Sequence, residues 1–263
     1  MNSVSVFSTR WHVKSFIGLH LFAFIWLGIF LTEGGFQFWR SIDQQVFFFL
    51  NGSLADGGSW AAFWAWANVR ASDTVPAILM LVALSFPGMG IKRDRLQQAL
   101  IGFILLLVLM FPIRETVYEV AVSMGVSGNS PSLTLEPVYF FSQMFPDIPA
   151  KDRAGHSFPG DHATVLLCWA GFMMLNARNL LSISALLLAF AFMLPRLVGG
   201  AHWASDNLVG GMFSAIITMA WAFCTPLMHI FTSQVHKLLQ PVIRLFCKIP
   251  LLNKLPILQQ SVR

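Results

Sequence analysis

Long apolar runs separated by shorter polar segments dominate the pattern of the chain. Six runs approach the length of a membrane helix, and they cover residues 16–32, 71–88, 97–117, 162–177, 180–196 and 206–230. A helix needs about 20 apolar residues to cross the hydrocarbon core, and tilt or neighbouring residues make up for the shorter runs. The pattern predicts an all-α, polytopic integral membrane protein with about six transmembrane helices, folded as one membrane domain over residues 1–263.

Composition excludes a soluble fold. Hydrophobic residues make up 56% of the chain and charged residues only 11%, against roughly 25% charged residues in a soluble domain. The net charge of +5 resides in the short segments between apolar runs, so it indicates membrane topology and no nucleic-acid partner. The three cysteines, Cys168, Cys224 and Cys247, are odd in number and lack metal-ligand spacing, so we expect them to be packing residues.

The distribution of Lys and Arg predicts an orientation. With the N-terminus in the cytoplasm, most of the 17 basic residues lie in cytoplasmic segments, with Lys92-Arg93-Asp94-Arg95 as the clearest cluster. Both termini are then cytoplasmic, and the segments 33–70 and 118–161 lie outside. We expect the aromatic residues of the first segment to be interfacial anchors, and the second to be a long loop. The tail, 231–263, is predicted to be amphipathic and to lie on the inner leaflet.

Two polar clusters carry the candidate chemistry, and both fall on the outer side. In the second cluster, His202 and Asp206 are four residues apart and would share one face of a helix. A carboxylate bonded to one ring nitrogen fixes the tautomer and leaves the other nitrogen free to attack. Arg196 can hold phosphate oxygens through paired donors, and Gly199 and Gly200 allow close approach of the backbone.

The first cluster, Ser157 to His162, immediately precedes the fourth apolar run. Pro159 and Gly160 predict a turn into a helix, whose free N–H groups bind anions. His162 is placed there to donate a proton to a leaving oxygen, and the upstream Lys151 and Arg153 can complete a cationic phosphate pocket. Two distant clusters at one membrane face indicate phosphoryl transfer through a histidine.

The same residues can also have purely structural roles, without any part in chemistry. His202 and Asp206 can form a structural pair, Arg196 can extend to the interface, and Lys151 and Arg153 can be solvated loop charges. Arg70 with Asp73, at the start of the second run, either binds substrate phosphate or forms a local ion pair. A transporter or lipid-binding protein would carry charges along a path across the membrane, whereas these runs are nearly charge-free at their midplanes.

These residues resemble the type 2 phosphatidic acid phosphatase superfamily over about residues 65–230. Pro159-Gly160-Asp161-His162 takes the place of the family motif P-S-G-H, and Arg196, His202 and Asp206 have the spacing of S-R-x5-H-x3-D, with Pro195 replacing the Ser. The resemblance implies that His202 forms a phosphohistidine, that Asp206 orients it, that His162 is the leaving-group acid, and that Arg196 holds the phosphoryl oxygens. It also implies that no metal or other cofactor is used.

The departures from the family pattern narrow the resemblance to one branch. The motif K-x6-R-P is absent, and its cationic role falls to Lys151 and Arg153, with Gly160 and Asp161 at the phosphate and Arg70 and Ser157 as further candidates for contacting substrate. The segments around both motifs resemble the lipid A 1-diphosphate synthases. That resemblance implies transfer of a phosphoryl group from undecaprenyl diphosphate to the 1-phosphate of lipid A at the periplasmic face of the bacterial inner membrane. The alternative is a phosphatase of undecaprenyl diphosphate or another lipid phosphate, because the residues alone do not select the acceptor.

Overall fold

The computed structural model describes residues 5–88, 91–177 and 180–259, and this part of the chain is almost entirely helical. Its only β-type contact within those ranges is an isolated antiparallel bridge between Val69 and Ala150. The prediction of an all-α fold is therefore confirmed. The main helices are α1 (Val13–Leu31), α2 (Glu33–Gly52), α3 (Gly58–Ala67), α4 (Thr74–Ser85), α5 (Leu96–Ser123), α6 (Phe141–Met144), α7 (Asp161–Asn176), α8 (Leu180–Val198), α9 (Met212–Cys224) and α10 (Leu227–Cys247).

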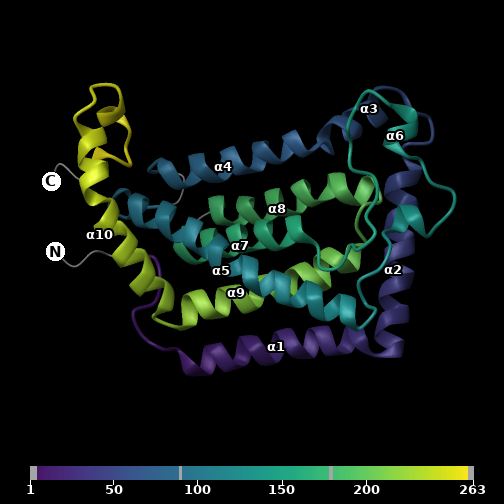
Figure 1. The fold of residues 1–263 in the computed structure, drawn as a ribbon, viewed down its shortest axis with the longest axis horizontal. Helices are drawn as coiled ribbons and strands as arrows, with labels where there is room; N and C mark the ends of the chain where they lie inside the picture. Colours follow the sequence, from purple (N-terminus) through teal and green to yellow (C-terminus); the bar gives the residue numbers. More distant parts are fainter. Residues whose placement is uncertain (1–4, 89–90, 178–179, 260–263) are drawn as a thin grey trace.

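Six of these helices, α1, α4, α5, α7, α8 and α9, run roughly along one direction and form the body of the molecule (Figure 1). Helix α7 lies among α5, α8 and α9, and its side chains are largely buried. Trp169, Phe172 and Met173 of α7 belong to the largest apolar cluster, together with Phe103 and Leu106 of α5. Burial of this cluster fixes α7, and α7 begins at the residues of the first polar motif.

Each of the six helices overlaps one of the predicted apolar runs. Three stretches, Val13–Leu31, Arg93–Ser123 and Asp206–Cys224, are long and apolar enough to cross a membrane, and Ser182–Val198 is a shorter apolar helix. Helix α4 has 12 residues, which gives it a length of only about 18 Å. The sixth run is shorter than predicted, because the helix stops at Cys224 and α10 begins at Leu227, after Pro226.

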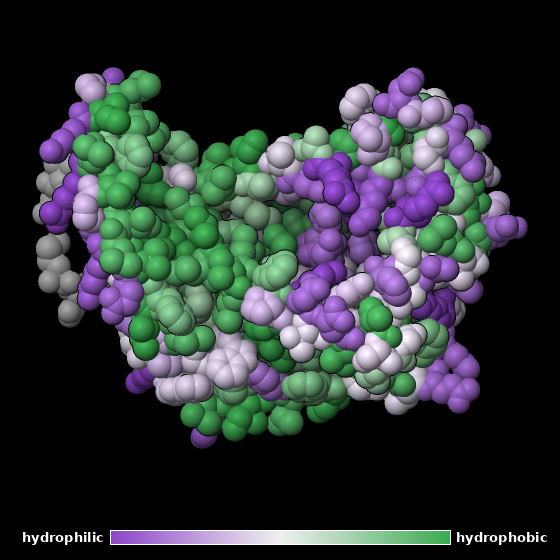
Figure 2. Space-filling model, viewed as in Figure 1, coloured by the Kyte–Doolittle hydropathy of each residue, from purple (hydrophilic) through white to green (hydrophobic). Residues whose placement is uncertain are grey.

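The two ends of the bundle differ in character. At one end α2 lies across the bundle axis, accompanied by α3, α6 and the segment 124–160, whereas α10 and both ends of the described chain lie at the opposite end (Figure 1). Hydrophilic side chains gather near the α2 end, and hydrophobic ones cover most of the remaining visible surface (Figure 2). The segment 33–70, for which the sequence analysis gave no secondary structure, is mostly helical. One expectation is corrected here: α5 continues to Ser123, so the long loop begins later than residue 118.

The aromatic residues expected at the interface are on or near the surface of α3. Trp60, Phe63 and Trp66 are more than half exposed, whereas Trp64 packs against an inner cluster that includes Phe141. The three cysteines are free thiols, with Cys168 and Cys224 buried and Cys247 half-buried. The three cysteines are therefore unpaired, and the two inside the apolar runs are packing residues, as the sequence predicted.

Candidate active site

Three segments of the chain converge at the α2 end of the bundle. The turn after α8 carries His202, a π-helical turn, η4 (Asp206–Gly211), begins with Asp206, and α7 begins with Asp161 and His162. Gly200 reverses the chain directly after α8, with φ of 70°, and a Cβ atom there would come within 2.7 Å of Phe47. Glycine is thus required at this turn, both for its backbone conformation and for its close approach to α2.

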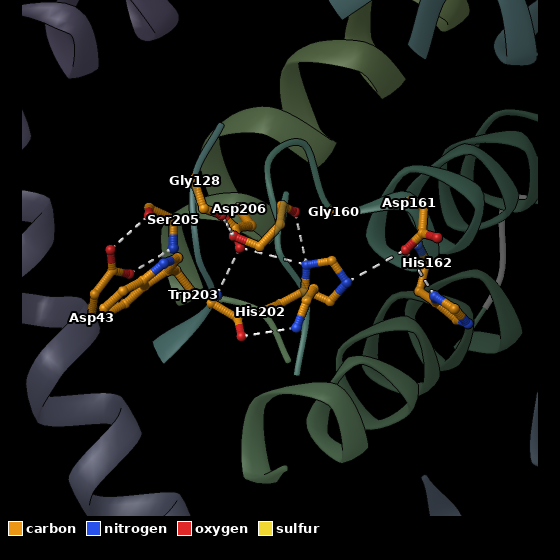
Figure 3. A network of polar contacts seen from close by, with 12 residues as sticks. Asp43, Gly128, Gly160, Asp161, His162, His202, Trp203, Ser205 and Asp206 are labelled. Atoms are coloured by element: carbon orange, nitrogen blue, oxygen red, sulfur yellow. Dashed lines mark hydrogen bonds and ion pairs between the residues drawn. The ribbon is translucent and has the colours of Figure 1, made fainter. Parts of the chain in front are cut away.

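His202 is held in one orientation by its Nδ1 atom. Its side chain is only 4% exposed, and Nδ1 donates a hydrogen bond of 2.9 Å to the carbonyl oxygen of Ser157. In a neutral imidazole with a proton on Nδ1, the lone pair is on Nε2. The Nε2 atom is buried, makes no hydrogen bond to the described residues, and faces Oδ1 of Asp161 at 3.5 Å (Figure 3).

Asp206 joins the two polar clusters to each other. Its Oδ2 atom lies 3.5 Å from Nδ1 of His202 and accepts a hydrogen bond of 2.7 Å from the Trp203 N–H. Its main-chain carbonyl accepts the N–H of Gly160 at 2.9 Å. The Ser157 carbonyl is thus the nearer acceptor for the His202 ring, and Asp206 adds a negative charge beside the ring and closes the turn from His202.

His162 and its two carboxylate neighbours form the next part of the site. Its Nδ1 atom lies 2.9 Å from Oδ1 of Asp161, and its Nε2 atom lies 3.0 Å from Oδ2 of Asp73. Two carboxylate acceptors match the two N–H groups of a doubly protonated ring. The same Oδ1 atom of Asp161 contacts both histidines, so one carboxylate bridges Nδ1 of His162 and Nε2 of His202 (Figure 3).

Arg196 is a buried cation with a fixed set of partners. The residue is 3% exposed, and Nη1 donates to both the carbonyl (2.7 Å) and the side-chain oxygen (2.6 Å) of Asn68. Its Nη2 atom pairs with Asp73 at 3.0 Å and lies 3.4 Å from Nε2 of His162. Asn68 therefore fixes one side of the guanidinium, and the other side is directed at Asp73 and His162.

A cavity of about 270 Å³ opens beside these groups. Asp73, Asp161, His162 and Arg196 form its polar part, and its remaining walls are mostly apolar side chains of α4, α7 and α8. His202 does not line the cavity, and Asp161 lies between the cavity and Nε2. The Asp161 side chain is 46% exposed, so it has room to turn away from His202 and admit a phosphoryl group.

Three other residues predicted to contact the phosphate or the substrate, Gly160, Ser157 and Asp161, make contacts within the fold instead. The N–H of Gly160 is used by Asp206, and a Cβ atom at Gly160 would meet Asn207 at 2.3 Å, so this glycine serves close packing. Ser157 contributes its carbonyl to His202, while its own N–H and hydroxyl donate to the Gly128 carbonyl. Asp161 contacts histidines rather than presenting a donor to phosphate.

The predicted cations Lys151, Arg153 and Arg70 have different surroundings. Arg153 pairs with Asp152 at 3.0 Å, donates to Ser142 and lies over the ring of Phe140, which ties it to the loop. The Lys151 N–H donates to the Asn68 carbonyl that also binds Arg196, and its half-buried ammonium has no partner among the described residues. Arg70 is exposed.

From the sequence, Asp73 is a candidate partner of Arg70, and Asn68-x-Arg70-Ala71-x-Asp73 belongs to the resemblance to the lipid A 1-diphosphate synthases, without a role for Asn68. In the structure Asp73 pairs with Arg196 and His162 instead, so the local Arg70–Asp73 ion pair is not formed. Asn68 and Asp73 lie 128 and 123 positions from Arg196, and no local pattern reports contacts over such a separation. Both lie at the start of the second apolar run, and this position and the family resemblance of the segment are the sequence signals that point to them.

Burial and charge act in opposite directions on the pKa of His202. Burial alone would lower it, but the neighbouring carboxylates of Asp161 and Asp206 outweigh burial and raise the pKa above its ordinary value of 6.5.

Within the described ranges no group of three or more His, Cys, Asp or Glu side chains has the arrangement of a metal site. Arg196 contributes a positively charged side chain to the cavity lining.

The sequence comparisons agree with this geometry. The PAP2 superfamily matches residues 115–231, which include His162, Arg196, His202 and Asp206. The chain is also 31% identical to lipid A 1-diphosphate synthase of Escherichia coli (strain K12) over 193 residues, which cover 72% of this chain and 78% of the relative.

The chain belongs to the PAP2 superfamily. As a PAP2 protein it is an enzyme of the lipid phosphatase and phosphotransferase class, as the resemblance of its motifs predicted. Its apolar helices make it a membrane protein. No solved structure matches the chain. Asn68, Asp73 and the whole of α2 lie outside the PAP2 match, so part of the site is built by residues that precede it.

Proposed function

We propose that this PAP2 protein is a lipid A 1-diphosphate synthase, which transfers a phosphoryl group from undecaprenyl diphosphate to the 1-phosphate of lipid A. The observation that carries the proposal is the buried Nε2 atom of His202, which has no hydrogen-bond partner in the described chain and faces Asp161, a residue that lines the cavity together with Arg196 and His162. The identity to the Escherichia coli enzyme of that name supports the choice of substrates.

In the first step, the lone pair of His202 Nε2 attacks the terminal phosphorus of the donor diphosphate. A P–N bond forms, the bond from that phosphorus to the bridging oxygen breaks, and the lipid monophosphate leaves. His162 donates a proton to the bridging oxygen, while the Ser157 carbonyl and Asp206 stabilise the charged His202 ring. Arg196 Nη2 releases Asp73 and binds an oxygen of the phosphoryl group instead. The guanidinium then stabilises the negative charge that the equatorial oxygens carry in the transition state.

In the second step, an oxygen of the acceptor phosphate attacks the phosphohistidine. The P–N bond breaks, a new P–O bond forms, and His162 takes back any proton that the acceptor carries. A lipid phosphate is already a nucleophile near neutral pH, so this acceptor needs less activation than water. The apolar walls of the cavity, which include Met80, Leu166 and Phe192, suit the first part of a lipid chain below the head group.

We further propose that the six helices that form the body of the molecule all span the bacterial inner membrane. The site then lies at the periplasmic face, and both termini lie in the cytoplasm. The position of the site at the α2 end and of α10 at the other end supports this orientation (Figure 1), as does the excess of Lys and Arg near α10 and the α4–α5 connection. Reporter fusions at Arg95 and Gly128 should report opposite sides of the membrane. Reports from the same side would contradict the six-span topology.

The decisive experiment follows labelled phosphate from undecaprenyl diphosphate in purified protein, with and without lipid A. Label on lipid A, at a rate that depends on lipid A, supports the transferase, whereas release to water at the same rate in both reactions identifies a phosphatase. His202→Ala should abolish turnover and acid-labile labelling of the protein. Wild-type activity in this variant would refute the histidine mechanism.

A further inference from the structure

A carboxylate outside the PAP2 match lies buried behind the catalytic turn. Asp43 of α2 is 1% exposed, and its two oxygens accept hydrogen bonds from Ser205, at 2.8 Å from the N–H and 2.6 Å from the hydroxyl (Figure 3). A buried carboxylate is costly unless it is paired and hydrogen-bonded. The two hydrogen bonds from Ser205 offset part of this cost, and they indicate that Asp43 is buried there in order to hold Ser205.

Ser205 lies inside the turn that connects the nucleophile to its neighbouring carboxylate. It follows His202 by three residues and directly precedes Asp206, whose side chain closes the turn onto the Trp203 N–H. Because Asp43 binds both the main chain and the side chain of Ser205, it fixes the turn in position and in rotation. The distance from Asp206 to the His202 ring depends on that rotation.

Arg40, one helical turn before Asp43, strengthens the same contact. Its guanidinium pairs with Asp43 at 3.3 Å and lies over the ring of Trp203, 4.2 Å from the ring centre. Trp203 in turn donates from its indole nitrogen to the carbonyl of Asn129, in the loop at the site. Helix α2 thus holds the residue after His202 and the residue before Asp206 through two adjacent side chains.

We propose that Asp43 is a positioning residue for phosphoryl transfer, which acts through Ser205 to hold Asp206 and His202 in the geometry of attack. The inference rests on the proposed function, because the geometry matters only if His202 is the nucleophile. It goes beyond the family match, which begins at residue 115 and contains neither Asp43 nor Arg40. Helix α2 therefore acts as part of the catalytic machinery as well as a cover for the bundle.

The contact needs hydrogen-bond geometry more than it needs a charge. Burial raises the pKa of Asp43 to about 6, with Arg40 and the hydrogen bonds from Ser205 acting in the opposite direction and Asp206 adding to the rise. A protonated carboxyl keeps one acceptor for the Ser205 N–H and can donate to the hydroxyl, and an asparagine has the same pair of groups. Asp43→Asn should therefore preserve the contact, and Asp43→Ala should lose it.

The test compares four variants of the full-length protein in the labelled transfer assay. Asp43→Ala should lower kcat by about a hundredfold, the typical result of a displacement near 1 Å at a catalytic group, and leave KM within about threefold. Asp43→Asn should stay within about fivefold of wild type, because it keeps both bonds to Ser205 and loses only the 3.3 Å ion pair with Arg40. Ser205→Ala keeps only the N–H bond and should fall between them. Asp56→Ala removes an exposed carboxylate near the end of α2 and serves as the matched control.

The outcomes are distinguishable from each other and from failure of the proposed function. Wild-type protein that transfers no phosphoryl group refutes the proposed function before the variants are considered. With active wild type, unchanged kcat in Asp43→Ala overturns the positioning role. So does equal inactivation of Asp43→Ala and Asp43→Asn with matching losses of thermal stability, since that marks a purely structural carboxylate. If Asp43→Ala does not fold, the kcat of Ser205→Ala decides, and a value equal to that of Asp56→Ala overturns the proposal.

Discussion

Asn68 offers the sharpest test of how the site holds its cation. Both oxygens of Asn68 bind Nη1 of Arg196, so Asn68→Ala removes the side-chain acceptor at 2.6 Å and leaves the carbonyl at 2.7 Å. Asn68 is fully buried, so water cannot readily replace the lost acceptor. The guanidinium can then rotate about its remaining partners, and Nη2 no longer faces the cavity in a fixed direction.

The size of the effect follows from the bond that is lost. A hydrogen bond between a neutral and a charged group contributes about 1.5–3 kcal/mol. If this loss appears fully in the transition state, where Arg196 must hold the phosphoryl oxygens, kcat/KM falls by roughly ten- to 150-fold. Any part of the loss that is confined to folding lowers the thermal stability and leaves the rate of the folded enzyme unchanged.

A matched variant separates these two effects. Asn51 is also buried and makes three hydrogen bonds, to the main chain of Tyr139 and Val198, and it makes none to Arg196. Asn51→Ala should lower the melting temperature at least as much as Asn68→Ala does, and it should lower kcat/KM much less. The reasoning is refuted if both variants lose the same activity, or if Asn68→Ala retains the activity of wild type.

Three further predictions concern pH, the loop cations and metal ions. Because the pKa of His202 is raised and only the neutral ring attacks, kcat/KM should rise with pH through a midpoint above 6.5. Asp161→Asn removes one of the charges that raise this pKa and should move the midpoint to lower pH, and an unchanged midpoint in a pH–rate profile would contradict the assignment. Lys151→Ala should lower kcat by about a hundredfold if its free ammonium binds phosphate, whereas Arg153→Ala, whose guanidinium is already paired, should stay within a few-fold in the same assay. Transfer activity should survive EDTA, since Arg196 supplies the charge for phosphate; loss that a divalent ion restores, with substrate dispersion unchanged, would count against this.

The fold was predictable to the extent that it depends on apolar length. All six apolar runs became helices, because each must bury or cover a continuous hydrophobic surface. Helix ends were less predictable: α5 passes Glu115 and Glu119 to end at Ser123, since Val117, Val120 and Val122 continue its apolar surface. The sequence analysis assigned no secondary structure to residues 33–70, and the structure places α2 and α3 there.

The site was predictable where its residues follow one another in the chain. The spacing of Arg196, His202 and Asp206 is local, and the structure brings it together with His162. The acceptor for His202 Nδ1 is a main-chain carbonyl, which every residue possesses, so no residue type reveals it. Asn68, Asp73 and Asp43 reach the site only through packing of distant helices, and their contacts follow from the fold rather than from any motif.

The ion pair between Asp73 and Arg196 has a consequence for inhibition by free phosphate. The carboxylate is attached to the same molecule and lies 3.0 Å from the cation, so it competes at an effective concentration of millimolar or more. An inorganic phosphate ion must overcome this internal competitor with its charge alone. A lipid substrate also gains about 0.8 kcal/mol for each methylene that it buries, and it can therefore displace the carboxylate where the free ion cannot. On the proposed function, we therefore expect inorganic phosphate to inhibit the enzyme only weakly, because Arg196 would exchange Asp73 more readily for a phosphate that carries a hydrocarbon chain.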